Sequence, residues 1–330
     1  MASHASRHHQ QGLALITAVL VVAIVATVAT TLALGEQVWF RQAQNMANRA
    51  QAESLRQGAL DYAAILLTRD GKDNKTDHLG ELWAKPLPPL PVEDGMIAFA
   101  VADAQGRFNL NNLVRNGAPS PADIAMFQRL LSAQGVDPGL SETLRDWLDP
   151  DSIISQGGAE DIDYLSLPQP YRTANQSLQS VDELRLVKGF TAKTVEKLRP
   201  YVTALPVPTT VNVNTAPDQV LAALFTNLPA SALQPVLDSR VNQPFADAAQ
   251  FIARMPSGTS PPPPSLYGIN TGYFLVTIDI RYGRLQRRTE ALIERTSGKP
   301  ATVLWHRLAP LQFATAMDGG SAGKAGAVFP

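Results

Sequence analysis

The 330-residue sequence contains no cysteine, which excludes disulfides, thiolate catalysis and cysteine-ligated zinc. Its formal net charge is only -1 and no strong basic block is present, so wholesale electrostatic binding to nucleic acid is not expected. His78 and His306 stand alone in the sequence, and no zinc-protease, nucleophile-elbow or phosphate-loop motif is found. These absences argue against an enzyme.

One long apolar run is present. Residues Leu13–Leu34 contain no ionisable group, and at about 1.5 Å per residue a helix over them is roughly 33 Å long, enough to cross a bilayer. Arg7 precedes the run and Glu36 follows it, so the positive-inside bias places the N-terminus in the cytoplasm and most of the chain on the other side. A signal-peptidase site at Ala33–Gly35 would instead remove the run, and this alternative stays open.

The helical pattern continues beyond the apolar run. Residues 36–67 contain no proline and a single glycine, Gly58, and their apolar residues recur at three- and four-residue spacing. We therefore predict one long N-terminal helix, half of it in lipid and half packed on a globular domain.

Proline and turn residues divide the rest of the chain. The proline-rich residues 85–91 exclude regular helix, and alternation over 96–102 predicts a hairpin that turns at Asp103–Gly106 into a second strand through Phe108 and Leu110. Helical periodicity and helix caps predict an all-helical region at 120–256. A stiff linker at 257–265 precedes strands on both sides of Tyr282-Gly283 and a third near 302–307.

This order predicts an α+β fold, in which a long N-terminal helix packs on an antiparallel sheet and a large all-α domain is inserted. The predicted divisions are a leader at 1–12, a transmembrane segment at 13–35, the outer part of the helix at 36–68, a first α/β part at 69–115, the inserted all-α domain at 116–256, the linker at 257–265, the remaining strands at 266–310 and a disordered tail at 311–330.

Six carboxylates crowd one loop-rich stretch that has little Lys or Arg nearby. They are Asp146, Asp149, Asp151, Glu160, Asp161 and Asp163. Because close carboxylates repel unless a cation separates them, the stretch predicts a bound cation. Calcium suits it, since calcium takes six to eight oxygens in flexible loops and Gly157 and Gly158 allow close approach of the backbone. A solvated acidic loop with an ordinary turn at Asp149-Pro150 is the alternative.

The N-terminus resembles the type IV pilin and pseudopilin class. A short polar leader ends at Gly12, and an apolar helix begins at Leu13 and continues as an amphipathic helix. In this class a prepilin peptidase cuts after the glycine, which would leave Leu13 as the mature, methylated N-terminus. Most members carry glutamate at the fifth mature position, where this chain has Thr17. A carboxylate in lipid without a partner is costly, so Thr17 suggests a subunit with nothing ahead of it, at the filament tip.

The soluble part resembles one family within that class. It carries a series of phrases: RFNLNNL at 107–113, RDWLDPD at 145–151, GAED at 158–161, PYRTAN at 170–175, DELR at 182–185 and VNVNTAP at 211–217. In this order the chain is similar, over residues 11–307, to the type II secretion system minor pseudopilin K family. The resemblance implies a subunit that caps a short periplasmic pseudopilus and promotes protein export across the outer membrane, with structural calcium in its helical insertion.

The resemblance also implies the partners. They are minor pseudopilins I and J, the other pseudopilus subunits, the prepilin peptidase and the inner membrane, and the tip could contact secreted substrates or the outer-membrane secretin. Contacts with neighbouring helices are expected through Leu55, Ala59, Tyr62 and Ala63.

Two other functions stay open from the sequence. A tip subunit of a related type IV pilus or competence system would share the leader and the helix. The Leu186–Phe190 turn and the VNVNTA phrase also resemble helix-hairpin-helix or SAM-like modules, some of which bind DNA. Here Lys-Gly-Phe replaces Gly-x-Gly, and nearby basic residues are offset by acidic ones, so no nucleic acid is expected.

Overall fold

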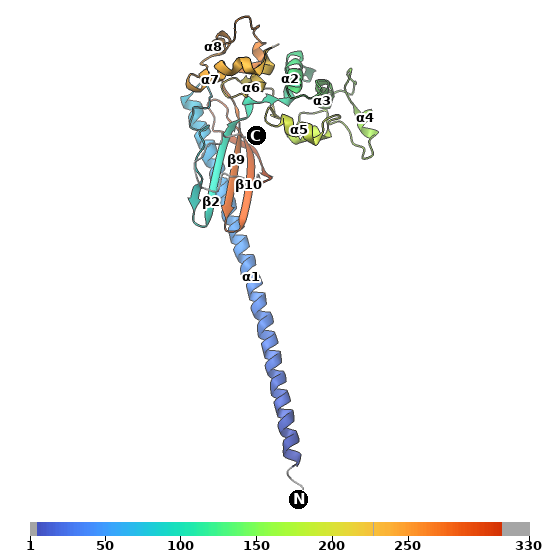
Figure 1. Cartoon of the computed structure of the whole chain (residues 1–330), viewed down its shortest axis with the longest axis vertical. Coiled ribbons are helices and arrows are strands. Elements are labelled where there is room, and N and C mark those ends of the chain that lie inside the picture. Colours follow the sequence, from blue (N-terminus) through green and yellow to red (C-terminus); the bar gives the residue numbers. More distant parts are fainter. Residues whose placement is uncertain (1–4, 227, 312–330) are drawn as a thin grey trace.

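The computed structural model describes residues 5–226 and 228–311 and divides into a rod and a head (Figure 1). The rod is a single helix, α1 (Ala5–Asp73), which is apolar and long enough in its N-terminal part to cross a membrane. Side chains from Leu15 to Leu34, including Thr17, are exposed. The predicted long helix is thus confirmed, and it ends at Asp73, five residues beyond the predicted end.

A five-stranded antiparallel sheet lies against the C-terminal part of α1, where Ala52–Leu67 contribute to a shared core, whereas residues 36–47, predicted to pack on the head, are exposed. Its strand order is β1-β2-β9-β10-β11, and the strands are β1 (Leu90–Val92), β2 (Gly95–Asp103), β9 (Tyr273–Tyr282), β10 (Leu285–Glu294) and β11 (Thr302–Ala309). Alternate residues of these strands face α1 and form one core with the helix. The β9–β10 hairpin turns at Gly283, whose φ of +54° suits glycine, so the predicted hairpin around Tyr282-Gly283 is confirmed.

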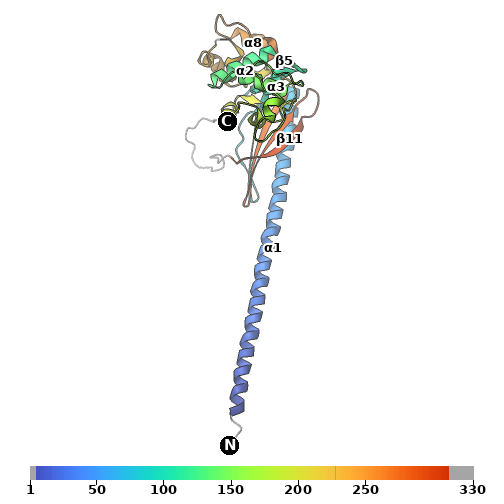
Figure 2. The same cartoon turned by 90° about the vertical axis from the view of Figure 1, so that its right-hand side faces the viewer.

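A second domain lies beyond the sheet, at the end of the molecule away from the N-terminus (Figure 2). Its helices are α2 (Pro121–Ala133), α3 (Leu140–Leu148), α4 (Asp161–Leu165), α5 (Ala192–Leu198), α6 (Asp218–Leu224), α7 (Gln234–Asn242) and α8 (Ala248–Ala253), with 3-10 turns η1 (Ala104–Gly106), η2 (Leu110–Leu113), η3 (Val181–Leu186), η4 (Ala230–Leu233) and η5 (Pro264–Leu266). They enclose a core separate from that of the sheet.

The same asparagine pairing occurs in two parts of this domain, the first lobe, which contains Asn111 and Leu178, and the second lobe, which contains Asn214 and Phe245. In the first lobe, the side chain of Asn111 accepts from the backbone N–H of Leu178 at 2.8 Å and donates to its carbonyl at 2.9 Å. In the second lobe, Asn214 makes the same pair of bonds with Phe245, at 2.8 and 3.1 Å. Each amide thus satisfies a buried peptide unit that no strand partner reaches.

The structure corrects the predicted hairpin of residues 96–110. β2 pairs with β9 and with the short edge strand β1, not with the segment after Gly106. That segment, β3 (Phe108–Asn109), pairs in parallel with β6 (Val202–Thr203) inside the helical domain. Pro91 is compatible with β1 because an edge strand can leave one side of its backbone unpaired.

The predicted boundaries of the insertion are also too narrow. Phe108, Leu110 and Leu113 belong to its core, and so do Leu266 and Tyr267 at the other end. Nor is the insertion all helical, since β7 (Val211–Asn212) pairs with β8 (Tyr267–Gly268), and β4 (Val114–Arg115) pairs with β5 (Ala118–Pro119). The predicted tail lies outside the described residues except for Leu311, and so do residues 1–4 of the predicted leader.

Candidate functional site

Three of the six predicted carboxylates converge in the loop between α3 and α4. Asp149, Asp151 and Glu160 each place one oxygen so that the three atoms lie within 4.8 Å of one another. Asp149 follows α3 directly, and Glu160 is the N-cap of α4, so the two helices fix the positions of these side chains. Asp149 is 5% exposed and Glu160 is 2% exposed, whereas Asp151 is exposed.

Several oxygens at this loop lack a hydrogen-bond donor. Asp149 Oδ1 and Glu160 Oε1 are buried with no partner among the residues that the structure describes. The same holds for Asn175 Oδ1, while Asn175 Nδ2 donates to the carbonyl of Asp151 at 2.9 Å. Sequence reasoning missed Asn175 as a site residue, because it lies 24 positions after Asp151. Its PYRTAN phrase was a signal only of family resemblance.

The electrostatics of the loop follow from burial and like charge. Burial raises the pKa of Asp149 to about 6, and the neighbouring Asp151, Asp146 and Glu160 carboxylates add to the shift. Burial likewise raises the pKa of Glu160, against the opposing effect of a hydrogen bond from Thr173. The two buried carboxylates are therefore costly to ionise together, and a cation would remove that cost.

The other three predicted carboxylates have partners of their own. Asp146 is fully buried and accepts from the backbone N–H of Ser155 at 3.0 Å, from the Ser155 hydroxyl and from Arg145. Its carboxylate fills the space that a side chain at Gly158 would need, since a Cβ there would lie 1.8 Å from Asp146 Oδ2.

Asp161 and Asp163 are also engaged. Asp161 pairs with Arg172 and accepts from Thr173, and Asp163 binds Lys188 Nζ at 2.7 Å and accepts from the backbone N–H of Glu160 at 3.2 Å. The prediction of little compensating Lys or Arg is therefore wrong for these residues. The basic partners lie next to Asp146 or more than ten residues away from Asp161 and Asp163.

Most of the residues predicted to contact neighbouring helices face the chain's own sheet instead. Ala59 and Ala63 are buried against the chain's own sheet, and Leu55 packs on the same core. Tyr62 is 49% exposed and makes an edge contact with Phe99. The spacing identified an apolar face correctly, but that face covers the sheet, and of the four residues only Tyr62 is free to meet a partner.

Three cations of the helix-hairpin-helix region are paired with carboxylates, whereas Lys193 and Lys197 of α5 are exposed. Lys188 binds Asp163, Arg185 binds Glu196 at 3.0 Å, and Arg199 binds Asp182 at 2.6 Å. Gly189 has a φ of +89°, as the hairpin turn requires. These pairs offset part of the positive charge that a phosphate backbone would need.

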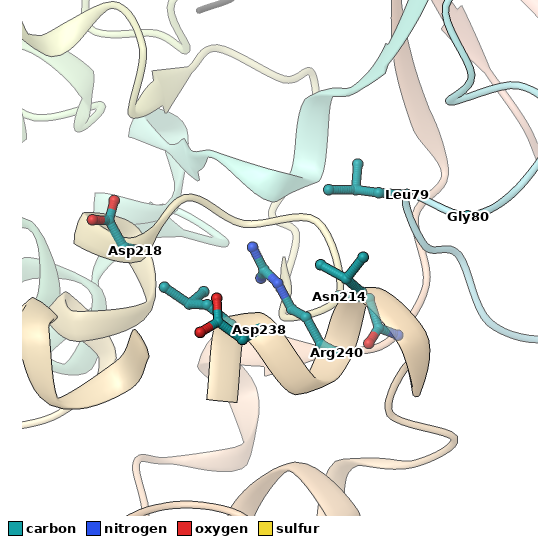
Figure 3. A pocket seen from close by; sticks show the side chains of 8 residues that line it. Leu79, Gly80, Asn214, Asp218, Asp238 and Arg240 are labelled. Atoms are coloured by element: carbon teal, nitrogen blue, oxygen red, sulfur yellow. The ribbon is translucent and has the colours of Figure 1, made fainter. Parts of the chain in front are cut away.

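A cavity of about 340 Å³ lies where the head meets the end of the rod. Figure 3 shows Leu79 and Gly80 on one side of it and Asp218, Asp238 and Arg240 on the other. Arg240 donates to the carbonyl of Val213 at 2.7 Å, and burial lowers its pKa to about 10, so it stays charged at neutral pH. The cavity thus mixes opposite charges and offers no convergent ligand set.

The chain is similar to known proteins along nearly its whole length. Two family models, both described as type II secretion system protein K, match residues 106–207 and 211–270. The type II secretion system protein K of Pseudomonas aeruginosa is 36% identical over 301 residues, covering 88% of this chain and 90% of the relative. This chain belongs to the type II secretion system protein K family.

Further relatives agree with that membership. The type II secretion system protein K of Klebsiella pneumoniae is 33% identical, over 87% of this chain and 93% of the relative. A solved structure of the GspK-GspI-GspJ complex from enterotoxigenic Escherichia coli contains a chain with a TM-score of 0.72 and 27% identity. That chain is covered completely, and the match spans 82% of the present one. The predicted family and α+β fold are therefore confirmed, and this protein K is a minor pseudopilin of the secretion system.

The raised pKa of Asp149 predicts how stability depends on pH when divalent cations are removed. Folding raises this pKa from an ordinary 3.8 to about 6, so the folded state holds the proton more tightly and Asp149 favours folding most below pH 4. That contribution is lost as pH rises through 6. Asp149→Asn has no group that ionises there, so its free energy of unfolding relative to wild type should increase by on the order of 1–3 kcal/mol as the pH rises from 4 to 6. Its melting temperature should rise above that of wild type over the same range. Thermal melts in a chelator from pH 4 to 8 measure the gain.

Asp163→Asn is the matched control. The bond from Lys188 lowers the pKa of Asp163 below its ordinary 3.8, so the stabilisation that Asp163 gives is complete above about pH 4. From pH 4 to 8 this variant should therefore be less stable than wild type by a constant amount. A difference between Asp149→Asn and wild type that stays constant across the pH range would contradict the electrostatic assignment.

Proposed function

We propose that this chain caps the tip of the type II secretion pseudopilus, assembled with minor pseudopilins I and J, and so promotes export across the outer membrane. The observation that carries the proposal is the position of the two-lobed helical domain, which lies beyond the sheet at the end away from the membrane helix (Figure 1). A further subunit stacked in line with the rod would meet this domain. The similar chain from Escherichia coli was solved within such a three-protein complex, GspK-GspI-GspJ.

The membrane helix supports the same position in the filament. Its apolar part carries Thr17 in place of a carboxylate, so no buried negative charge there needs an amine from a neighbouring subunit. The proposed orientation has the N-terminus in the cytoplasm and the head in the periplasm, on the basis of Arg7 before the span and Glu36 after it. The head could then contact secreted substrates or the outer-membrane secretin.

The outer face of α1 is the proposed contact for neighbouring helices. Gly58 and Ile65 lie on the face of α1 opposite the sheet. Tyr62 lies at the edge of that face, where it also contacts Phe99 of β2. Ile65 is 68% exposed, and a side chain at Gly58 would meet nothing within 4 Å. An exposed glycine within a helix costs about 1 kcal/mol relative to alanine. Close approach of another helix gives a reason for that cost.

Calcium is the proposed occupant of the loop between α3 and α4. Asp149, Asp151 and Glu160 would hold it, and the orphaned buried oxygens of Asp149, Glu160 and Asn175 fit a cation that accepts oxygen ligands. The ion would supply positive charge next to Asp149 and Glu160, which have no ion pair in the described part of the chain. Asn175 already donates to the Asp151 carbonyl, so the residues themselves bring the loop and the 171–175 segment together.

The tip assignment predicts that assembly depends on the outer face of α1. Ile65→Asp should reduce co-purification with minor pseudopilins I and J in detergent by about tenfold or more, because losing burial of one large aliphatic side chain costs about 1.5–3 kcal/mol. The matched control is Leu308→Asp on β11, which is 67% exposed in the same way but remote from that face. Equal recovery of the partners with both variants would remove the assigned face, and failure of wild type to recover them would remove the tip proposal.

The calcium assignment predicts a metal-dependent melting temperature for the full chain. Calcium at about 100 times its dissociation constant adds roughly 2.7 kcal/mol, a shift of several degrees that a chelator should reverse. Asp149→Asn should lose the part of this shift that comes from the loop, whereas Asp163→Asn should keep the whole shift because Asp163 is occupied by Lys188. The assignment fails if calcium shifts wild type and Asp149→Asn equally, or shifts neither.

The class resemblance predicts processing after Gly12. N-terminal sequencing of the chain from membranes should begin at Leu13, and Gly12→Val should leave the leader attached. Gly35→Val serves as the control and should not change the start. A mature chain that begins at Glu36 and is recovered free in the periplasm would show removal of the span and would contradict the membrane anchor.

A further inference from the structure

A second group of buried carboxylates lies at the joint between rod and head, far along the chain from the α3–α4 loop. Asp70 comes from the last turn of α1, and Asp77 and Glu81 come from the segment that follows it. One oxygen from each lies within 4.8 Å of the others, and these three residues form the joint cluster. Asp77 is 2% exposed and Glu81 is 7% exposed.

One cation pairs with two members of the joint cluster. Arg295, at the end of β10, binds Asp70 through Nη1 and Asp77 through Nη2, and its guanidinium lies over the ring of Phe274. Gly71 leaves room for it, since a Cβ at that position would lie 2.9 Å from Arg295 Cδ. Two ionised carboxylates and one guanidinium leave one negative charge, and an ionised Glu81 makes it two.

Glu81 is the residue of the joint cluster that has an oxygen without a hydrogen-bond donor. Its Oε2 accepts from Trp83 Nε1 at 2.7 Å and from the backbone N–H of His78 at 3.1 Å. Its Oε1 is buried and has no hydrogen-bond partner within residues 5–226 and 228–311. His78 Nε2 lies 4.0 Å from this oxygen, which is too far for a hydrogen bond.

We propose that the joint cluster is a second divalent-cation site, in which Asp70, Asp77 and Glu81 present carboxylate oxygens to a calcium-type ion. The ion would complete the coordination of Glu81 Oε1 and offset the two negative charges that Arg295 leaves. This site shares no residue with the α3–α4 loop, so the two proposed cation sites can be tested independently.

The ligand set selects the class of cation. Carboxylate oxygens favour calcium or magnesium over zinc and copper. His78 does not add a nitrogen ligand, because its Nδ1 accepts from the N–H of Gly80 at 3.1 Å and its Nε2 therefore carries the proton. Bonds from Arg295, Trp83 and Thr271 fix the carboxylates, so they cannot rearrange into the near-ideal octahedron that magnesium requires, whereas calcium tolerates irregular geometry.

The position of the site suggests its role. The backbone of Asp77 donates to the carbonyl of Ile269 at 3.0 Å and accepts from Asn212 of the second lobe at 3.0 Å, while its side chain accepts from Thr271 N at 2.7 Å. An ion on Asp77 therefore connects the end of α1, the sheet and the helical domain. It would stiffen the link through which the rod carries the head.

Calcium titration calorimetry on the full chain in detergent tests the site. The Asp149→Asn background weakens the loop site, and binding that remains should disappear, or weaken at least about tenfold, when Glu81→Gln is added, which corresponds to 1.4 kcal/mol or more. Asp73→Asn is the matched control, because Asp73 is an exposed carboxylate at the same helix end that pairs with Arg69. Adding it should leave the residual binding unchanged.

The negative charge of the joint cluster could also be reduced by a proton on Glu81. The same variants distinguish this protonation from a bound ion. If Asp149→Asn binds no calcium, or if Asp149→Asn and Asp149→Asn/Glu81→Gln bind it equally, the proposal is overturned. Folding is checked by melting in a chelator, where Glu81→Gln should melt at or above its parent because it removes a buried charge without removing the acceptor for Trp83.

Terbium in place of calcium gives a second readout that depends on location. The Trp83 indole bonded to Glu81 should sensitise terbium emission from the joint cluster in the Asp149→Asn background. Trp83→Phe should abolish that emission while the calcium isotherm persists, and Glu81→Gln should abolish both. Emission that survives both substitutions would place the ion elsewhere and contradict the proposal.

Discussion

The packing of one face of α1 on the sheet is the interaction on which the rest of the structure depends, because the same helix anchors the chain and supports its head. Ala52, Ala59 and Ala63 are buried at this contact and have no side chain beyond Cβ, so the helix axis can lie close to the strands. Leu60 and Leu67 fill the remaining space. A helix that buries one stripe in its own domain has only the opposite face for neighbours. The internal packing therefore decides which residues are left for assembly.

The paired asparagines are the next constraint, since they hold lobes that have little regular sheet. Asn109 and Asn212 each accept from the N–H of an asparagine two residues later, and Asn111 and Asn214 each bind both backbone groups of one distant residue. Burying a peptide unit without partners is costly, and an amide side chain supplies a donor and an acceptor in the spacing of a strand. The RFNLNNL and VNVNTAP phrases thus have a physical cause that is the same in both lobes.

Local patterns predicted the elements whose partners are near in sequence. The long helix and the β9–β10 hairpin follow from periodicity and a turn at Gly283, and α2 follows from Pro121 at its start and Gly135 after its end. The hairpin at 96–110 was predicted wrongly because β2 pairs with β9, about 180 residues later, and alternation cannot identify a distant partner. The contact residues on α1 were wrong for a related reason: spacing defines a face without saying what covers it. In the acidic stretch, composition predicted a cluster, but only the fold shows that Arg172 and Lys188 reach Asp161 and Asp163.

Other carboxylates of the head are paired with arginines, in contrast to Asp149, Glu160 and Glu81. Asp123 is 1% exposed and receives two bonds from Arg115, and Asp279 receives two from Arg288. These buried or half-buried carboxylates are thus neutralised by a guanidinium in a bidentate pair, which is a strong form of charged hydrogen bond. Asp149, Glu160 and Glu81 are buried as deeply, yet each has one oxygen without a partner in the described part of the chain. A buried charge without a partner costs several kcal/mol, so the balancing charge at these residues has to come from outside the polypeptide, as an ion or a proton.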